Sequence, residues 1–232
     1  MKKVKAIFFD WGLTFVKGFR KERNKEIDKI LRPFGIGWKK FNLLYWRPFY
    51  ILRSAGKIKS DKDFEIAIQR ATRKKIPVRK IIEVAVKGQI IPSSHVGIVQ
   101  KLRKNYKVGI LSNNVENWVR KVMKNYRIEN LFDAVIISSR VKARKPNALI
   151  YYQALKKLRV NPEESIFVAD EVAEDLVAAS GLGMKTIWLK TKEKSWWKES
   201  DDKILKIYQP DAIVKNLKEI IPIIESYDNQ NF

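Results

Sequence analysis

The stretch FFDWGLTFV, residues 8–16, places one carboxylate, Asp10, directly after an apolar run that begins at Val4. A short apolar run without polar alternation is typical of a strand that is buried on both faces of a parallel sheet. The position two residues after Asp10 is Gly12, so residues 10–16 carry a single acid. We therefore predict a first buried strand over residues 4–9 that ends at a carboxylate.

Further runs of the same kind follow later in the chain, and patterns with helical spacing separate them. The alternation of strand and helix predicts an α/β fold with a doubly wound parallel sheet. Pro146 is expected in the first turn of its helix, because proline suits that position. The predicted strands are residues 107–112, 134–138, 165–169, 185–189 and 211–214, and the predicted helices are residues 96–104, 115–126, 146–158, 175–180 and 216–227.

Residues 15–88 break this alternation, because they read as consecutive helices with Gly and Pro between them. Ser60, with Asp63 three residues later, predicts the N-terminus of one of these helices. We therefore expect a core domain of residues 1–14 and 89–232, and a small helical cap domain of residues 15–88. The helices expected in the cap are residues 20–34, 38–54, 61–75 and 78–87.

Length and composition limit the class of protein. The 232 residues are 45% hydrophobic, so one large domain with an insert can bury a core. No apolar run approaches the roughly 20 residues of a membrane span, and the N-terminal run is too short for a signal peptide. There is no cysteine, which excludes disulfides and thiolate metal sites. We expect a cytoplasmic monomer or homodimer that does not contact a membrane, with a composition that resembles that of thermophile proteins.

The net charge of +23 is extreme, and residues 15–89 carry 21 basic and 7 acidic residues, a net charge of +14. Three interpretations stay open: attraction of an anionic substrate, contact with nucleic acid, and a solvated charged surface. The excess of positive charge is too large for ion pairing within the segment to neutralise. A small anionic phosphorylated substrate is therefore the favoured partner, and nucleic acid is possible but not favoured.

Polar residues follow four of the predicted strands, at the edge where ligands bind in such sheets. Carboxylates from this set are the hard oxygen ligands that Mg²⁺ prefers, and an ionised aspartate beside a bound phosphate can attack it. The sequence thus predicts a Mg²⁺ and phosphate site at this edge. The residues that converge there are Asp10, Ser112, Asn113, Asn114, Lys145, Asp170, Glu171 and Asp175.

Four short motifs carry a resemblance to a known family. They are DWGLT at residues 10–14, LSNN at residues 111–114, RKP at residues 144–146 and VADEVAED at residues 168–175. Because these four motifs occur in this order, the chain resembles the haloacid dehalogenase superfamily, in the branch with a helical cap after the first strand. The resemblance implies a Mg²⁺-dependent phosphatase that forms an aspartyl-phosphate on Asp10.

The resemblance also implies a role for each matching residue. Asp10 would be the nucleophile and a metal ligand, and the Gly12 carbonyl would bind the same ion. Ser112 and Asn113 would hold phosphate oxygens, and Lys145 would neutralise the nucleophile and the phosphoryl group. The remaining metal-site residues would be Asp170 and Asp175, the latter supporting the ion or the lysine.

Four positions depart from the family pattern: Ala169 and Glu171 replace a glycine and a small residue in the fourth motif, and the other two lie in the first motif. Gly12 stands where the phosphatases usually carry the aspartate that protonates the leaving group, and Leu13 replaces a usual glycine. Such acid–base help contributes about 10²–10⁴-fold. Its loss would be tolerated if the leaving group is good, if the cap supplies the acid, or if the reaction is different. Lys57 and Lys59 are the candidate acids and substrate contacts of the cap.

Other functions remain as alternatives. One is a C–P hydrolase resembling phosphonoacetaldehyde hydrolase, with an imine on a cap lysine; another is a non-catalytic binding protein for nucleic acid or protein. A dehalogenase is disfavoured because Asp170 is kept. His95 is expected on the surface in a first helical turn. The aromatic residues of residues 38–50 are expected to pack the cap, with a base-stacking or substrate-lining role for one or two of them as the alternative. Trp196 and Trp197 are expected to pack over the sheet edge, with an exposed patch as the alternative.

Overall fold

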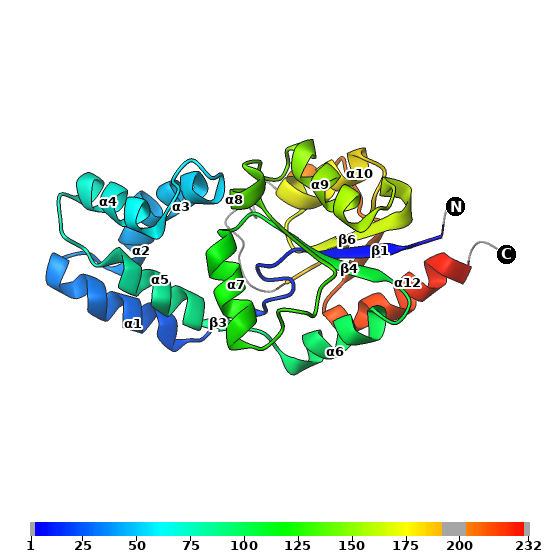
Figure 1. Cartoon of the computed structure of the whole chain (residues 1–232), viewed down its shortest axis with the longest axis horizontal. Helices are drawn as coiled ribbons and strands as arrows, with labels where there is room; N and C mark the ends of the chain where they lie inside the picture. The colour runs from blue at the N-terminus through cyan, green and yellow to red at the C-terminus, as the bar shows by residue number, and fades with distance from the viewer. Residues whose placement is uncertain (1–2, 192–202, 230–232) are drawn as a thin grey trace.

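The computed structural model of the protein describes residues 3–191 and 203–229 (Figure 1), so Trp196 and Trp197 lie outside the described residues. A sheet of six strands in the order β5-β4-β1-β6-β7-β8 forms its centre, and every neighbouring pair is parallel. This confirms the predicted α/β fold. The strands are β1 (Ala6–Phe9), β4 (Lys107–Ser112), β5 (Ala134–Ile137), β6 (Ser165–Ala169), β7 (Lys185–Leu189) and β8 (Ala212–Val214).

Helices cover both faces of the sheet, α9 and α10 on one side and α6 and α12 on the other (Figure 1). Side chains of β1 alternate between two hydrophobic clusters: Ile7 and Phe9 belong to one, and Ala6 and Phe8 to the other. This explains why the strand is apolar throughout, because both of its faces are buried. The helices around the sheet are α6 (Ser93–Leu102), α7 (Glu116–Asn125), α9 (Ala148–Leu158), α10 (Val177–Gly181) and α12 (Ile220–Asn229).

The start of α9 differs from the prediction. Pro146 was expected in its first turn, but the helix begins at Ala148 and the Lys145–Pro146 bond is cis. Asn147 has an extended backbone and its side chain accepts a hydrogen bond from Leu149 N, 2.9 Å away. Asparagine is a preferred N-cap residue, and as the cap it places the first helical residue, Ala148, two positions after the proline.

The segment between β1 and α6 forms a group of helices beside the sheet, at the left of Figure 1. The chain leaves the core along β2 (Gly18–Phe19) and returns along β3 (Gln89–Ile90), and these two strands pair antiparallel. We keep the name cap for this helical group. Its helices are α1 (Glu22–Leu31), α2 (Trp38–Phe41), α3 (Arg47–Ser54), α4 (Asp61–Thr72) and α5 (Val78–Lys87), with a 3₁₀ turn over Arg32–Phe34.

Two wide π-helical turns interrupt the predicted helices. The first, η2 (Asn42–Trp46), joins α2 to α3, and Arg47 N donates to the Asn42 carbonyl five residues back. Pro48, which follows, has no N–H with which to continue the ordinary helical ladder. The second, η4 (Val172–Leu176), leads into α10. Turns of this type are frequent at functional sites, and both of these line the cavity described below.

In the part of the chain that the structure describes, we find no helix with both the length and the apolar character that a membrane crossing requires.

Candidate active site

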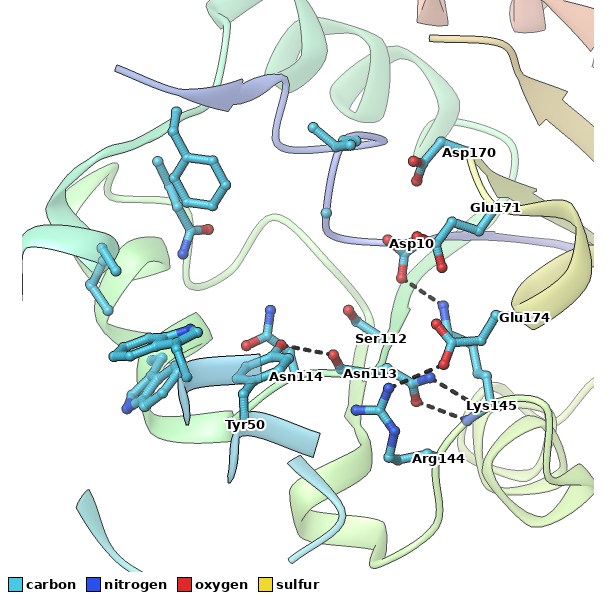
Figure 2. Close-up of a pocket in the computed structure, with 18 of the residues that line it drawn as sticks. Asp10, Tyr50, Ser112, Asn113, Asn114, Arg144, Lys145, Asp170, Glu171 and Glu174 are labelled. Carbon is cyan, nitrogen blue, oxygen red and sulfur yellow. Dashed lines mark hydrogen bonds and ion pairs between the residues drawn. The ribbon is translucent and has the colours of Figure 1, made fainter. Parts of the chain in front are cut away.

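Three polar side chains meet where β1, β4 and β6 end. Asp10 follows β1, Ser112 is the last residue of β4, and Asp170 follows β6; all three are buried. The strands are direct neighbours in the sheet, and Asp10 N donates to the Val168 carbonyl at 2.9 Å. Figure 2 shows the three side chains at one cavity. Their convergence follows from the parallel sheet, because the carboxyl ends of its strands share one edge.

Lys145 joins two of the acids. Its Nζ lies 2.6 Å from Asp10 Oδ1 and 2.7 Å from Asp175 Oδ1. Burial by itself lowers the pKa of Lys145, but the carboxylates of Asp10 and Asp175 outweigh it and hold that pKa well above its usual value. The side chain of Asn113 fixes the lysine backbone, because it donates to the Lys145 carbonyl at 3.0 Å and accepts from Lys145 N at 2.8 Å. Lys145 is therefore a fixed cation.

Asp170 lies beside Asp10 without a comparable cation. Burial is the larger cause and the charge of Asp10 the next, and together they raise the pKa of Asp170 to about 8. The hydroxyl of Thr14 donates to Asp170 Oδ1 at 3.0 Å, but this neutral group does not balance the carboxylate charge. Two adjacent buried carboxylates repel each other, and a divalent cation between them would remove that repulsion.

The donor set suits one kind of metal ion. The described residues contain no group of three or more His, Cys, Asp or Glu side chains placed to hold an ion. Mg²⁺ does not need such a group, because proteins bind it through one or two carboxylates together with water and substrate phosphate. Asp10 and Asp170, with backbone carbonyl oxygen from the loop after β1, fit that pattern.

The backbone of the loop after β1 shows what the two departures in the first motif mean for its conformation. Leu13 has a φ of 53°, in the left-handed region that favours glycine, so the glycine usual in the family would relieve strain here. Gly12 needs no such freedom, and a Cβ at Gly12 would meet only Asp10 Oδ2, at 3.8 Å. A side chain therefore fits at position 12, and space does not demand its absence.

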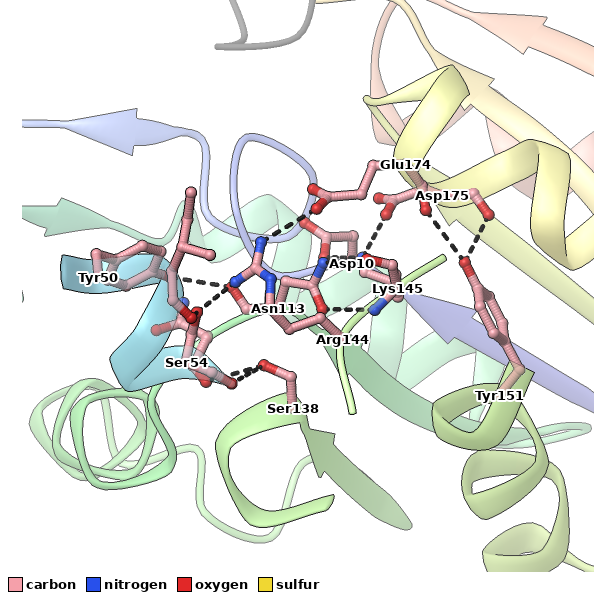
Figure 3. Close-up of polar contacts among 12 residues, drawn as sticks. Asp10, Tyr50, Ser54, Asn113, Ser138, Arg144, Lys145, Tyr151, Glu174 and Asp175 are labelled. Atoms are coloured by element: carbon pink, nitrogen blue, oxygen red, sulfur yellow. Dashed lines mark hydrogen bonds and ion pairs between the residues drawn. The ribbon is translucent and has the colours of Figure 1, made fainter. Parts of the chain in front are cut away.

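A network of polar contacts links this edge of the sheet to the cap (Figure 3). Arg144 donates to Ser54 Oγ in α3 and pairs with Glu174 at 3.1 Å. The Ser138 hydroxyl donates to the Ser54 carbonyl at 2.7 Å, and the Tyr50 hydroxyl donates to the Asn113 carbonyl at 3.0 Å. Sequence reasoning missed these residues as site components, although Arg144 and Glu174 lie within the motifs that it quoted.

A cavity of about 400 Å³ joins the strand ends to the cap. The cap side of its lining is largely aromatic, as is the part that α7 supplies, and Glu171 and Glu174 lie on the side of the strand ends. In Figure 2 the acids gather around Asp10, and Tyr50 lies across Ser112 and Asn113 from them. The aromatic lining residues of the cap and α7 are Phe19, Trp38, Trp46, Tyr50 and Trp118.

The expected cap contacts, Lys57 and Lys59, do not line this cavity. Both side chains are exposed, and Lys59 faces a separate hollow between the cap and α8 (Ser138–Val141). The reason is the packing of the loop that carries them: a Cβ at Gly56 would lie only 2.9 Å from the Ser139 carbonyl. The loop is thus held against the core near α8, and in this structure neither lysine reaches the cavity of Asp10.

His95 lies in the first turn of α6, as expected, but it is only half-exposed. Its Nδ1 lies 2.8 Å from the Phe15 carbonyl. It does not line the cavity of Asp10, which agrees with a structural role.

Comparison with known proteins places the chain in a family. The family described as haloacid dehalogenase-like hydrolase matches residues 53–189, more than half of the chain. A glyceraldehyde 3-phosphate phosphatase of Pyrococcus furiosus is 31% identical over 102 residues, which cover 43% of this chain and 42% of that protein. The pyrophosphatase PpaX of Bacillus mycoides is 28% identical over 127 residues, 54% of this chain and 56% of that protein. The chain thus spans about half the length of the curated relatives it matches.

Solved structures share the fold over most of the chain. A HAD family enzyme of Bacteroides thetaiotaomicron has a TM-score of 0.70 at 24% identity, over 86% of this chain and 99% of that one. A HAD phosphatase of Thermococcus onnurineus has a TM-score of 0.67 at 20% identity, over 95% and 98%. The family match, the sheet order and the residues at the strand ends agree. The chain belongs to the haloacid dehalogenase-like hydrolase family.

Proposed function

We propose that this protein is a Mg²⁺-dependent phosphatase that hydrolyses a small anionic phosphorylated metabolite through an aspartyl-phosphate on Asp10. The observation that carries the proposal is the buried Asp10 carboxylate, which lines the cavity with its Oδ1 2.6 Å from Lys145 Nζ. A carboxylate and a phosphate are both anions, so attack requires a fixed positive charge beside them. Lys145 supplies that charge without any rearrangement.

The neighbouring residues have distinct tasks in this proposal. The Ser112 hydroxyl, at the end of the adjacent strand, would donate to a phosphate oxygen. Asn113 holds the Lys145 backbone through two hydrogen bonds and would bind phosphate through its backbone. Asp175 pairs with Lys145 at 2.7 Å, so we assign it to positioning of the lysine and no longer to the metal.

Asp10, Asp170 and the Gly12 carbonyl would hold the Mg²⁺. When bound, the ion would stabilise negative charge on the transferring phosphoryl group. Support comes from the burial of the two carboxylates side by side. It also comes from a structural neighbour, because the HAD family enzyme of Bacteroides thetaiotaomicron has been solved with magnesium and inorganic phosphate.

The relatives support phosphate compounds as substrates, since they are named as a phosphatase of a phosphorylated aldehyde and as a pyrophosphatase. A C–P hydrolase would need a cap lysine at the reacting carbon. The candidates Lys57 and Lys59 are exposed and outside the cavity, so this alternative loses its support. A non-catalytic binding protein remains the rival from another class.

The test compares the wild-type protein with Asp10→Asn in the presence of Mg²⁺. The substrates are acetyl phosphate, inorganic pyrophosphate and glyceraldehyde 3-phosphate, and Asp63→Asn, an exposed change outside the cavity, is the matched control. We expect Asp10→Asn to lower kcat by about 10³-fold or more and the control to leave it unchanged. Activity that survives in Asp10→Asn would exclude this nucleophile. Absence of turnover, together with salt-sensitive binding of RNA or DNA, would favour the rival.

A further inference from the structure

The side of the cavity that faces away from the acids is built from aromatic rings. Trp118 of α7 stacks on Trp46 of the cap, with ring centroids 5.8 Å apart and an angle of 26°, and on Tyr50, at 5.9 Å and 25°. Trp38 meets Trp46 edge to face at 5.8 Å. All four line the same cavity as Asp10. We call these four residues the aromatic wall.

The polar atoms at the edges of two of these rings bond to other parts of the protein. Trp118 Nε1 donates to Asp61 Oδ1 at 2.9 Å, and the Tyr50 hydroxyl donates to the Asn113 carbonyl at 3.0 Å. Trp46 and Trp118 are buried and stack on each other, so the wall presents mainly the ring carbons of the half-buried Trp38 and Tyr50 to the cavity. Such a wall favours an apolar, flat group, because stacking on aromatic rings stabilises planar ligands.

The distribution of charge points to the same kind of ligand. Residues 15–89 carry 21 lysine and arginine residues. Of these, only Arg23 lines the cavity in the described part of the chain, and its guanidinium carbon lies 3.7 Å from the ring centroid of Phe19. The large positive charge of the cap therefore lies outside the cavity. Arg23 also lies 5.6 Å from the ring centroid of Trp38, so a second strongly anionic end of a substrate would find one cation there and little compensation along the rest of the aromatic wall.

Gly12 limits which leaving groups the proposed reaction can release. With no acid at position 12, the leaving group departs as an anion. A phenol has a pKa of about 10, as in tyrosine, and leaves readily as phenolate. An alkanol, with a pKa close to the value of about 15.7 for water, needs a proton from the enzyme.

From the aromatic wall and Gly12 together, we propose that the substrate is an aryl phosphate, in which the phosphoryl group is bonded to oxygen on an aromatic ring. The inference rests on the proposed phosphatase function. In the first step an Asp10 oxygen bonds to phosphorus, the bond between phosphorus and the aryl oxygen breaks, and phenolate leaves with the electron pair. In the second step water attacks the aspartyl-phosphate, which releases phosphate and regenerates the carboxylate. The proton from water passes to solvent, where the phenolate takes up a proton.

The leaving-group part of the proposal is tested with phenyl phosphate and benzyl phosphate. Both carry one ring, but only the first releases a phenolate. We expect the wild-type kcat/KM for phenyl phosphate to exceed that for benzyl phosphate by about 10²-fold or more. Gly12→Asp, for which the loop has room, should raise turnover of benzyl phosphate and reduce that ratio about tenfold. Equal wild-type values for the two esters would overturn the proposal.

The aromatic wall is tested by binding to the wild-type protein, because phosphonates have a P–C bond in place of the ester P–O bond and the proposed reaction does not cleave them. Phenylphosphonate should bind about tenfold or more tightly than methylphosphonate, because its ring stacks on the wall. Trp38→Leu should remove most of that difference. Leu44→Ala, an exposed change in the same segment, should retain it. Thermal unfolding of each variant shows that it is folded.

Acetyl phosphate separates the two proposals. If it is hydrolysed in an Asp10-dependent manner but phenylphosphonate binds no better than methylphosphonate, the phosphatase function stands and the aryl substrate is wrong. If no phosphate compound is hydrolysed at all, the proposed function fails, and the aryl proposal fails with it.

Discussion

At the scale of single residues, Lys145 is a buried cation that depends on two neighbouring acids. Its side chain is almost completely buried and pairs with two buried aspartates, Asp10 and Asp175. Breaking a buried ion pair by removing one partner is costly, because the other charge stays buried without compensation. The arrangement that, in the proposed function, prepares Asp10 for attack is therefore also a condition for the stability of the fold.

We predict that Lys145→Met lowers the free energy of unfolding by about 3–5 kcal/mol at neutral pH. Urea denaturation in the presence of a chelator measures this, because bound metal could otherwise replace the lost cation. Lys156→Met, an exposed change on α9, is the control and should cost less than about 0.5 kcal/mol. Equal stability of the two variants would show that the aspartates do not depend on the lysine.

His95, the one histidine of the sequence, gives a prediction about pH. Burial lowers the pKa of His95, and the nearby Lys17 charge lowers it further, while the hydrogen bond to the Phe15 carbonyl acts in the opposite direction. The unfolded chain takes up the proton near the ordinary pKa of about 6.5, but the folded protein does so only at lower pH. The unfolded state then binds more protons, so His95 makes the protein less stable as the pH falls below about 6.5.

The measurement is the free energy of unfolding of wild type and His95→Gln between pH 5 and pH 8 (a window of about three units around the histidine pKa). The raised pKa of Asp170, about 8, has the opposite effect, because the folded protein holds that proton first. The difference between the two proteins removes the contribution of Asp170. We expect wild type to lose stability relative to His95→Gln on acidification, and parallel curves would contradict this.

At the scale of elements, α4 begins with a complete capping box. Ser60 Oγ accepts a hydrogen bond from Asp63 N at 3.0 Å, and Ser60 N donates to Asp63 Oδ2 at 3.2 Å. We predict that Ser60→Ala lowers the free energy of unfolding by about 1 kcal/mol, because one N–H of the first turn loses its partner. Lys62→Ala, exposed in the same turn, is the control for chemical denaturation. If it costs as much as Ser60→Ala, the cap bond contributes nothing.

The helices and strands also show how much of the fold can be predicted from the sequence. The strands Lys107–Ser112, Ser165–Ala169 and Lys185–Leu189 match the predicted bounds, because burial on both faces leaves an unbroken apolar run. The meeting of Asp10 and Asp170 follows from the same reasoning, since adjacent parallel strands end at one edge.

The face that the cap presents to the site could not be predicted in this way. It depends on the contact of Gly56 with Ser139, which is distant in sequence, and on the π-helical turn Asn42–Trp46. No periodicity encodes either feature. The sequence therefore suggested the lysines of a glycine-containing loop, whereas the structure presents the aromatic rings of α2, the π-helical turn and α3.

At the scale of the whole molecule, the net charge of +23 should act on substrate capture. A phosphate dianion is attracted from a distance, and salt screens this attraction as the Debye length falls from about 30 Å at 0.01 M to about 8 Å at 0.15 M. We predict that kcat/KM for phenyl phosphate falls several-fold over this range, while kcat changes little. Steady-state kinetics at constant pH and Mg²⁺ measure both constants.

A variant with reduced charge provides the control. Lys74→Glu combined with Lys75→Glu changes two exposed residues between α4 and α5. The slope of kcat/KM against salt should be smaller in this variant than in wild type. A wild-type kcat/KM that does not respond to salt would mean that the surface charge has no part in substrate capture.

The short pairing of β2 with β3 has a consequence for how such a protein can change over time. Gly18 and Ile90 are partners across the two strands, so the chain leaves the core and returns to it at the same place. Antiparallel neighbours can be joined by a turn of about two residues, and the order of the six-stranded sheet would be the same with or without the stretch. The stretch is therefore an insertion whose length and sequence can vary without changing the sheet that carries Asp10, Ser112 and Asp170.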